Sequence, residues 1–134
     1  MMKYSKATNY ALHTMLFLAA SNSDKPVGVQ QLSKWQNVSP TYLSKILTKL
    51  TKEGMIHSSS GAHGGYTLQE KWEDLTFLDI IQAIEGTASL FDCCHNHKQG
   101  CLIQETMITA EVQMEEVLKN RKLSSIASKI SMMH

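Results

Sequence analysis

The stretch from Val29 to Leu68 constrains the fold of this chain more than any other part of the sequence. Within it, Ser39 precedes Pro40, and this pair predicts a helix start because serine is a good N-cap and proline is favoured at the first helical position. Apolar side chains then recur at helical spacing, at Leu43, Ile46, Leu47 and Leu50. The central prediction is therefore a helix that begins at Pro40 and buries one face.

The opposite face of this helix is polar and basic. It carries Thr41, Tyr42, Lys45, Thr48, Lys49 and Lys52. Lysines suit DNA phosphates, and hydroxyl groups and long donors suit base edges in the major groove. Because ordinary surface helices also carry scattered lysines, this face on its own favours a solvated surface over a binding site.

The segments on either side of the helix change that interpretation towards DNA binding. A shorter helix is expected over 29–36, followed by a tight two-residue connection, which gives a helix-turn-helix. Gly54 can end the longer helix in the left-handed conformation. Two short strands, 55–57 and 66–68, then flank a Ser/Gly-rich tip over 58–65. Such a hairpin in this position is typical of the wing of a winged helix.

Length, charge and hydropathy limit the classes of protein that fit. The 134 residues are enough for one compact core and a long helix. A net charge of +1 does not identify a nucleic-acid binder, but the segment from Leu32 to His57 carries four lysines and one glutamate, which predicts a basic face. No apolar stretch approaches the roughly 20 residues of a membrane span, and no signal-peptide cleavage region is present. We therefore expect a cytoplasmic protein that does not associate with membranes.

Further helices complete a mainly α fold with a small β-hairpin wing. A first helix is expected over 3–20, and another runs from a capping box at Thr76 to a terminating glycine at Gly86. A long helix over 102–120 has more apolar stripe than one small core can cover. We therefore expect this helix to pack on a second copy of the chain.

The expected organisation has three parts. Residues 1–86 form a winged helix-turn-helix DNA-binding domain, residues 87–101 form a Cys/His sensor loop, and residues 102–134 form the dimerisation helix and a C-terminal tail.

All three cysteines and two of the six histidines lie within nine positions of the loop. Thiolates and imidazoles are the ligands that hold zinc or iron–sulfur clusters. The candidate ligands are Cys93, Cys94, His95, His97 and Cys101. Adjacent Cys93 and Cys94 cannot readily bind one ion together, so the subset of ligands stays open and a further ligand is expected from elsewhere.

Three interpretations of the loop compete. A metal or iron–sulfur sensor is preferred, a thiol switch that joins Cys101 to Cys94 or Cys93 is close behind, and a loop without chemistry is the third. A small thiol enzyme is a rival of another class. It is disfavoured because no Cys-x-x-Cys motif opens a helix and no βαβ pattern could carry one.

The ordered combination of these segments resembles the iron–sulfur and nitric-oxide responsive winged-helix repressors typified by IscR and NsrR. The resemblance rests on residues 4–12, 39–50, 61–68 and 75–86, and it continues through the cysteine loop and the long helix. It implies a homodimeric repressor that binds a double-stranded DNA operator, with helix 39–52 in the major groove and the wing at the minor groove. It also implies a [2Fe-2S] or [4Fe-4S] cluster as the candidate cofactor.

The resemblance assigns roles to single residues. Base-reading positions map to Ser39, Thr41, Tyr42 and Lys45. Lys49 is expected to contact a phosphate, and Ser60 and His63 belong to the wing. Relatives often carry a minor-groove arginine where this chain has Ser60, and cluster-binding relatives can add an acidic ligand where this chain has Thr8. We expect the state of the loop to set the affinity for DNA.

Overall fold

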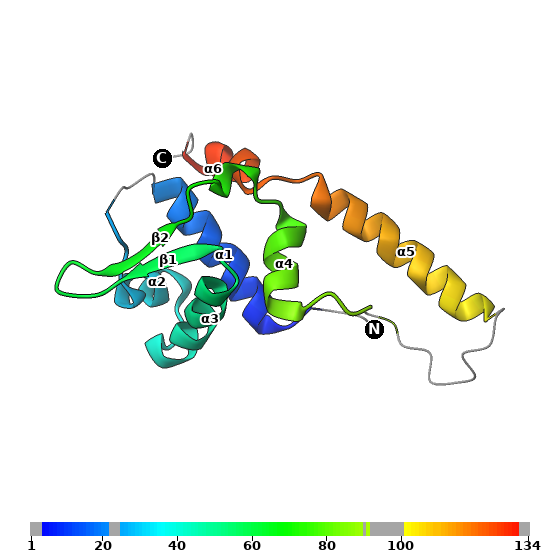
Figure 1. Ribbon diagram of the computed structural model, residues 1–134, viewed down its shortest axis with the longest axis horizontal. Helices are drawn as coiled ribbons and strands as arrows, with labels where there is room; N and C mark the ends of the chain where they lie inside the picture. Colours follow the sequence, from blue (N-terminus) through cyan, green and yellow to red (C-terminus); the bar gives the residue numbers. More distant parts are fainter. Residues whose placement is uncertain (1–3, 22–24, 90, 92–100, 132–134) are drawn as a thin grey trace.

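The computed structural model describes residues 4–21, 25–89, 91 and 101–131 (Figure 1). Within these residues the fold is mainly α-helical with one antiparallel hairpin, as the sequence predicts. The elements in chain order are α1 (Lys6–Ser21), α2 (Val29–Gln36), α3 (Pro40–Lys52), β1 (Ile56–Ser59), β2 (Gly65–Leu68), the 3-10 helix η1 (Trp72–Asp74), α4 (Phe77–Glu85), α5 (Leu102–Lys119) and α6 (Leu123–Ser131).

Helix α1 lies at the centre of the compact part of the molecule. It contacts α2, α3, α4, α6 and β2, and its Ala11 and Met15 are fully buried. Fully buried side chains from the surrounding elements complete one core, namely Leu32, Leu43, Leu47, Leu50, Ile56, Ile80 and Leu123. Burying a leucine contributes roughly 1.5–3 kcal/mol, so this core positions everything on the surface around it.

Helix α3 starts as the sequence predicts. The Tyr42 backbone N–H donates to Ser39 Oγ at 3.1 Å, and Pro40 occupies the first turn. The preceding turn reverses the chain at Asn37, which has a left-handed φ of 53°. The helix ends before Gly54, whose φ of +77° confirms the expected left-handed residue there. Helices α2 and α3 therefore form the predicted helix-turn-helix.

The hairpin is slightly longer than predicted. Its register runs from Ile56 opposite Leu68 to Ser59 opposite Gly65, so both strands reach further into the Ser/Gly-rich tip than expected. Tyr66 also exchanges two backbone hydrogen bonds with Val27, at 2.8 and 3.0 Å. This third backbone segment approaches so closely that a Cβ on Gly65 would lie 2.6 Å from the Val27 carbonyl oxygen. Glycine is therefore needed where the wing joins the core.

Helix α4 begins with the predicted capping box. The Asp79 N–H donates to Thr76 Oγ1 at 3.2 Å, and the Thr76 N–H donates to Asp79 Oδ2 at 2.9 Å. Helix α5 then extends to one side as an arm, and the chain returns through α6 to pack against α1 (Figure 1). Leu123 of α6 belongs to the same core as α1, although the sequence groups it with the dimerisation helix. The division of the chain into three parts stays a prediction.

Of the helices in the described ranges, none is both long and apolar enough to span a membrane.

Candidate nucleic-acid interface

The outer face of α3 presents the residues that the sequence singled out. Ser39, Thr41, Tyr42 and Lys45 are all exposed, while the inner face is anchored by fully buried leucines. The first turns of α3 are thus rigidly held and accessible together. Hydroxyl, phenol and ammonium groups on one helix face can donate to base edges and phosphate oxygens.

An aromatic contact holds the side chain of Tyr42. The rings of Tyr42 and Tyr10 meet edge to face, with centroids 5.7 Å apart and an interplanar angle of 81°. Such pairs contribute about 0.5–1.5 kcal/mol beyond burial. The sequence did not indicate this contact, because no local signal joins residues so far apart in the chain.

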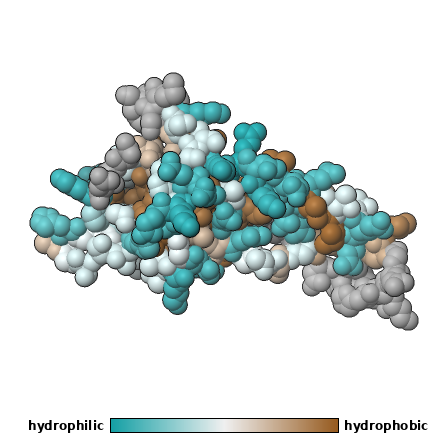
Figure 2. Space-filling view, turned by 45° about the horizontal axis from the view of Figure 1, so that its top comes forward, coloured by the Kyte–Doolittle hydropathy of each residue, from teal (hydrophilic) through white to brown (hydrophobic). Residues whose placement is uncertain are grey.

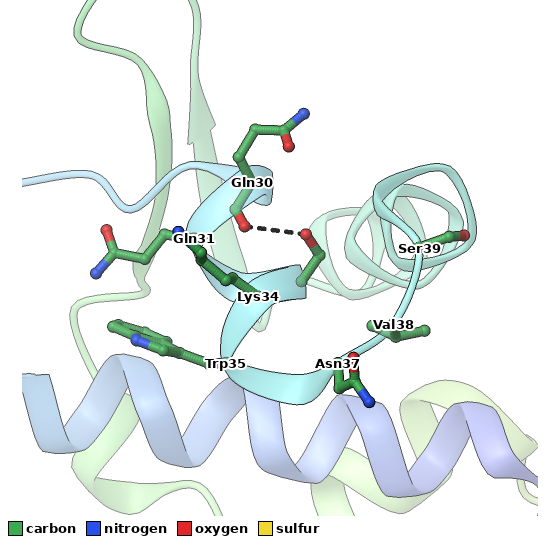
Figure 3. Close-up of a pocket in the computed structure, with 8 residues that line it drawn as sticks. Gln30, Gln31, Lys34, Trp35, Asn37, Val38 and Ser39 are labelled. Carbon is green, nitrogen blue, oxygen red and sulfur yellow. Dashed lines mark hydrogen bonds between the residues drawn. The ribbon is translucent and has the colours of Figure 1, made fainter.

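An open groove of about 840 Å³ lies beside α2, the turn and the start of α3 (Figure 3). In Figure 3 the side chain of Gln30 projects beyond the start of α2, away from Trp35, and Ser39 lies at the start of α3. The residues that line the groove are Gln30, Gln31, Ser33, Lys34, Trp35, Asn37, Val38 and Ser39. Its amide, hydroxyl and ammonium donors continue the polar face of α3. Lys34 is one of the four lysines in the basic segment from Leu32 to His57. The groove itself was not predicted from the sequence.

The lysines of α3 differ in their surroundings. Lys45 and Lys52 are exposed and, among the described residues, make no hydrogen bond or ion pair. Lys49, in contrast, donates its Nζ to the Ile84 carbonyl oxygen at 2.7 Å, near the end of α4. The expected phosphate contact of Lys49 stays a prediction, and the structure adds an intramolecular partner that the sequence did not indicate.

The wing carries Ser60 and His63 in the exposed tip between β1 and β2. At its base, His57 lies 3.4 Å from a Glu70 carboxylate oxygen. A backbone hydrogen bond and the neighbouring His57 hold the pKa of Glu70 below its ordinary value. Both side chains of this pair are well exposed, so we expect little stability from it.

Four of the five predicted ligands, Cys93, Cys94, His95 and His97, lie outside the described residues. Cys101 is described and caps α5, where its sulfur accepts from the Gln104 N–H at 3.5 Å. The described residues contain no group of three Cys, His, Asp or Glu side chains arranged to hold a metal ion. They therefore supply one thiol of the predicted set, that of Cys101.

Thr8 occupies the position in the first helix where the resemblance places an acidic ligand in cluster-binding relatives. In this structure Thr8 makes a hydrogen bond to Glu85. Thr8 is 2% exposed, and its Oγ1 donates to Glu85 Oε2 at 2.6 Å. The Ser5 N–H and hydroxyl donate to the same oxygen at 2.7 and 2.8 Å. Partial burial pushes the pKa of Glu85 upward, but these hydrogen bonds and the charge of Lys49 outweigh burial and leave the pKa below its ordinary value.

Comparison with known proteins agrees with this arrangement. The family model Rrf2, described as an iron-dependent transcriptional regulator, matches residues 4–129. The chain belongs to the Rrf2 family. Membership confirms the resemblance recognised in the sequence and places the chain among transcriptional regulators rather than small thiol enzymes.

Individual Rrf2 proteins match over different shares of the chain. The protein rrf2 of Nitratidesulfovibrio vulgaris is 35% identical over 92 residues, which are 69% of this chain and 61% of that protein, so the chain spans less than two thirds of its length. CymR, the global cysteine regulator of Bacillus subtilis, has a solved structure with a TM-score of 0.83 at 29% identity, over 96% of this chain and 98% of that one.

The solved structure of IscR from T. potens superposes with a TM-score of 0.81 at 26% identity, over 99% of this chain and 91% of that one. Its fold and that of CymR agree with the winged-helix architecture predicted from the sequence.

Proposed function

We propose that this Rrf2 protein is a homodimeric repressor that binds a double-stranded DNA operator through α3 and the wing. The observation that carries the proposal is the exposed polar face of α3, held in place by a fully buried leucine face. The groove beside α2 adds further donors next to the start of the same helix (Figure 3). An α-helix of this kind fits the major groove, whose base edges distinguish all four base pairs.

The proposed contacts divide into two kinds. Ser39, Thr41, Tyr42 and Lys45 would meet base edges and nearby phosphates from the first turns of α3. Ser60 and His63 would approach the backbone and minor groove from the wing tip. A serine lacks the cation that a narrow minor groove attracts, so we expect α3 to contribute more sequence preference than the wing.

Helix α5 supports the proposed dimer. It exposes Leu102, Ile103 and Val117, at 74%, 68% and 58% of their surface, and Figure 2 shows apolar side chains at the surface along the arm. A run of exposed apolar side chains on a helix is typical of an interface. A two-fold pairing of α5 would present two copies of α3 to two operator half-sites.

We further propose that the segment from Cys93 to Cys101 carries the signal. The description of the family model as iron-dependent supports an iron–sulfur cluster or another metal bound by a subset of Cys93, Cys94, His95, His97 and Cys101. A thiol–disulfide switch is the alternative, because relatives of this family include a global cysteine regulator and because three thiols lie close in the sequence.

The DNA-binding proposal is tested by selecting duplexes from a random library and titrating the best one at several salt concentrations. Thr41→Ala should alter the preferred bases. Lys45→Ala should also alter them, and it should reduce the slope of log Kd against the logarithm of the salt concentration by about one. A wild-type protein that retains no preferred sequence would contradict an operator-binding function.

The signal is tested on protein purified without oxygen, by visible absorption and by iron, sulfide and zinc content. Iron with sulfide and visible charge-transfer bands supports a cluster. A colourless protein without metal overturns the metal proposal, and DNA titrations of the reduced and oxidised protein then test the thiol switch.

A further inference from the structure

A cluster of hydrogen bonds joins the start of α1 to the end of α4. Ser5 and Thr8 together place three donors on one oxygen of Glu85, the last residue of α4. Figure 1 shows the two helix ends meeting beside α3. Hydrogen bonds are directional, so three donors on one carboxylate oxygen fix both the distance and the relative orientation of the two helix ends. Apolar contacts alone do not fix the orientation.

Lys49 connects the same end of α4 to α3, the second helix of the helix-turn-helix. Its Nζ donates to the Ile84 carbonyl oxygen at 2.7 Å. This carbonyl is one of the last four of α4, which have no partner inside the helix. The C-terminal end of a helix also carries partial negative charge, so an ammonium group is favoured there. One lysine of α3 thus holds the end of α4.

The other side of the same junction is tied to α5. Ser89 lies three residues beyond Gly86, and its Oγ donates to Glu111 Oε2 at 2.6 Å. Among the described residues of α5, Glu111 alone is buried, with 6% of its surface exposed. Burying a carboxylate is unfavourable unless it is hydrogen-bonded, so this position favours a specific polar contact. Polar contacts therefore join α3 to the end of α4, and they join the short segment that follows α4 to the middle of α5.

We propose that Lys49 and Glu85 are positioning residues that set the orientation of α3 relative to α5, and thereby the separation of operator half-sites that the dimer accepts. The inference rests on the proposed function, in which α3 contacts DNA and α5 joins the two copies. Lys49 then acts inside the protein, while Lys45, one helical turn earlier, acts on the DNA.

The experiment measures affinity for a panel of operators in which the half-site separation is shortened or lengthened by one and two base pairs. Full-length wild type is compared with Lys49→Met, which keeps the aliphatic chain but removes the donor. Lys49→Arg is the rescue variant. Lys52→Ala is the matched control, because it removes another exposed lysine from α3 that makes no described contact.

The wild type should prefer one separation by about tenfold or more, and Lys49→Met should reduce that preference by about tenfold, the size expected when one charged hydrogen bond is lost. Its salt dependence should match the wild type. Lys49→Arg should restore the preference, and Lys52→Ala should leave it unchanged. Thr8→Val removes a donor to Glu85 while keeping the branched shape of the side chain, and it should shift the preference in the same direction.

Two results would overturn the inference. One is an unchanged separation preference in folded Lys49→Met and Thr8→Val, with folding checked by circular dichroism. The other is a slope of log Kd against the logarithm of the salt concentration that is smaller by about one in Lys49→Met than in the wild type. Lys49 would then be a phosphate contact, as the sequence predicted. Failure of the proposed function is distinguishable, because the wild type itself would then show no operator preference.

Discussion

Helices α3 and α5 are both amphipathic, and they use their apolar faces in opposite ways. In α3, Leu43, Leu47 and Leu50 are fully buried in the core. In α5, the described residues bury only Glu111, and several large apolar side chains face outward. The same periodicity therefore indicates a core face in one helix and an unpaired face in the other. The difference arises because α3 is surrounded by other elements, whereas α5 extends beyond them (Figure 1).

The largest expected effect is a difference between α3 and α5 in how much an apolar-to-alanine substitution lowers the free energy of unfolding. Leu47→Ala in α3 should lower the free energy of unfolding by about 2–5 kcal/mol, because it removes fully buried methyl groups and leaves a cavity. Ile103→Ala in α5 should change it by less than about 0.5 kcal/mol at protein concentrations where the chain is monomeric. Urea unfolding of the two variants at low concentration measures both values. Equal losses would mean that the α5 face is covered within the monomer.

The second expected effect is a difference between two faces of α5 in how much a charged substitution weakens dimerisation. Ile103 and Val117 lie on one face, about 40° apart around the helix, while the exposed Val112 lies about 140° from Val117, because each residue turns an α-helix by about 100°. Val117→Glu should raise the dimer dissociation constant by about tenfold or more through a charge in a desolvated contact. Sedimentation equilibrium measures the constant.

The matched control for that face is Val112→Glu, the same change at another exposed valine of α5. It should have a smaller effect than Val117→Glu. If the two variants weakened association equally, the dimer would not use the face that contains Ile103.

Local sequence signals predicted the body of the fold well. Ser39 before Pro40, the capping box of Thr76 and Asp79, and the leucine spacing of α3 each act within a few residues, so the sequence contains the whole interaction. The contacts of Lys49 with Ile84 and of Thr8 with Glu85 join residues 35 and 77 positions apart. Periodicity places such side chains on a face but cannot say which distant group they meet.

The candidate site divides in the same way. Exposure of Thr41, Tyr42 and Lys45 followed from their places opposite the leucines of α3, but the support of Tyr42 by Tyr10 depends on how α1 crosses α3. In the cysteine loop, residue types indicate ligand chemistry without identifying the ligand subset. The sequence also did not predict that Leu123 packs in the core. A short terminal helix has too few periodic positions to show which surface it packs against.

The third expected effect compares the N-caps of the two helices. Ser39→Ala should lower the free energy of unfolding by about 1 kcal/mol, because it removes the acceptor for the Tyr42 N–H at 3.1 Å. Cys101→Ala should have a smaller effect under reducing conditions, since sulfur is a weak acceptor and its contact with the Gln104 N–H is 3.5 Å. Thermal unfolding of both variants measures the order, and a larger loss for Cys101→Ala would show that this thiol has a structural role beyond the cap.

The smallest expected effect concerns pH and the junction between the two regions. The pKa of Glu85 is lowered in the folded state from its ordinary value of 4.5, so its contribution to stability is present above pH 4.5 and is lost as the pH falls through the lower folded pKa. Glu85→Gln lacks this titration. The difference in unfolding free energy between wild type and Glu85→Gln should therefore be largest near pH 6 and shrink on acidification. Chemical unfolding at a series of pH values measures it, and a difference that stays constant would mean that the charge of Glu85 does not strengthen its bonds to Ser5 and Thr8.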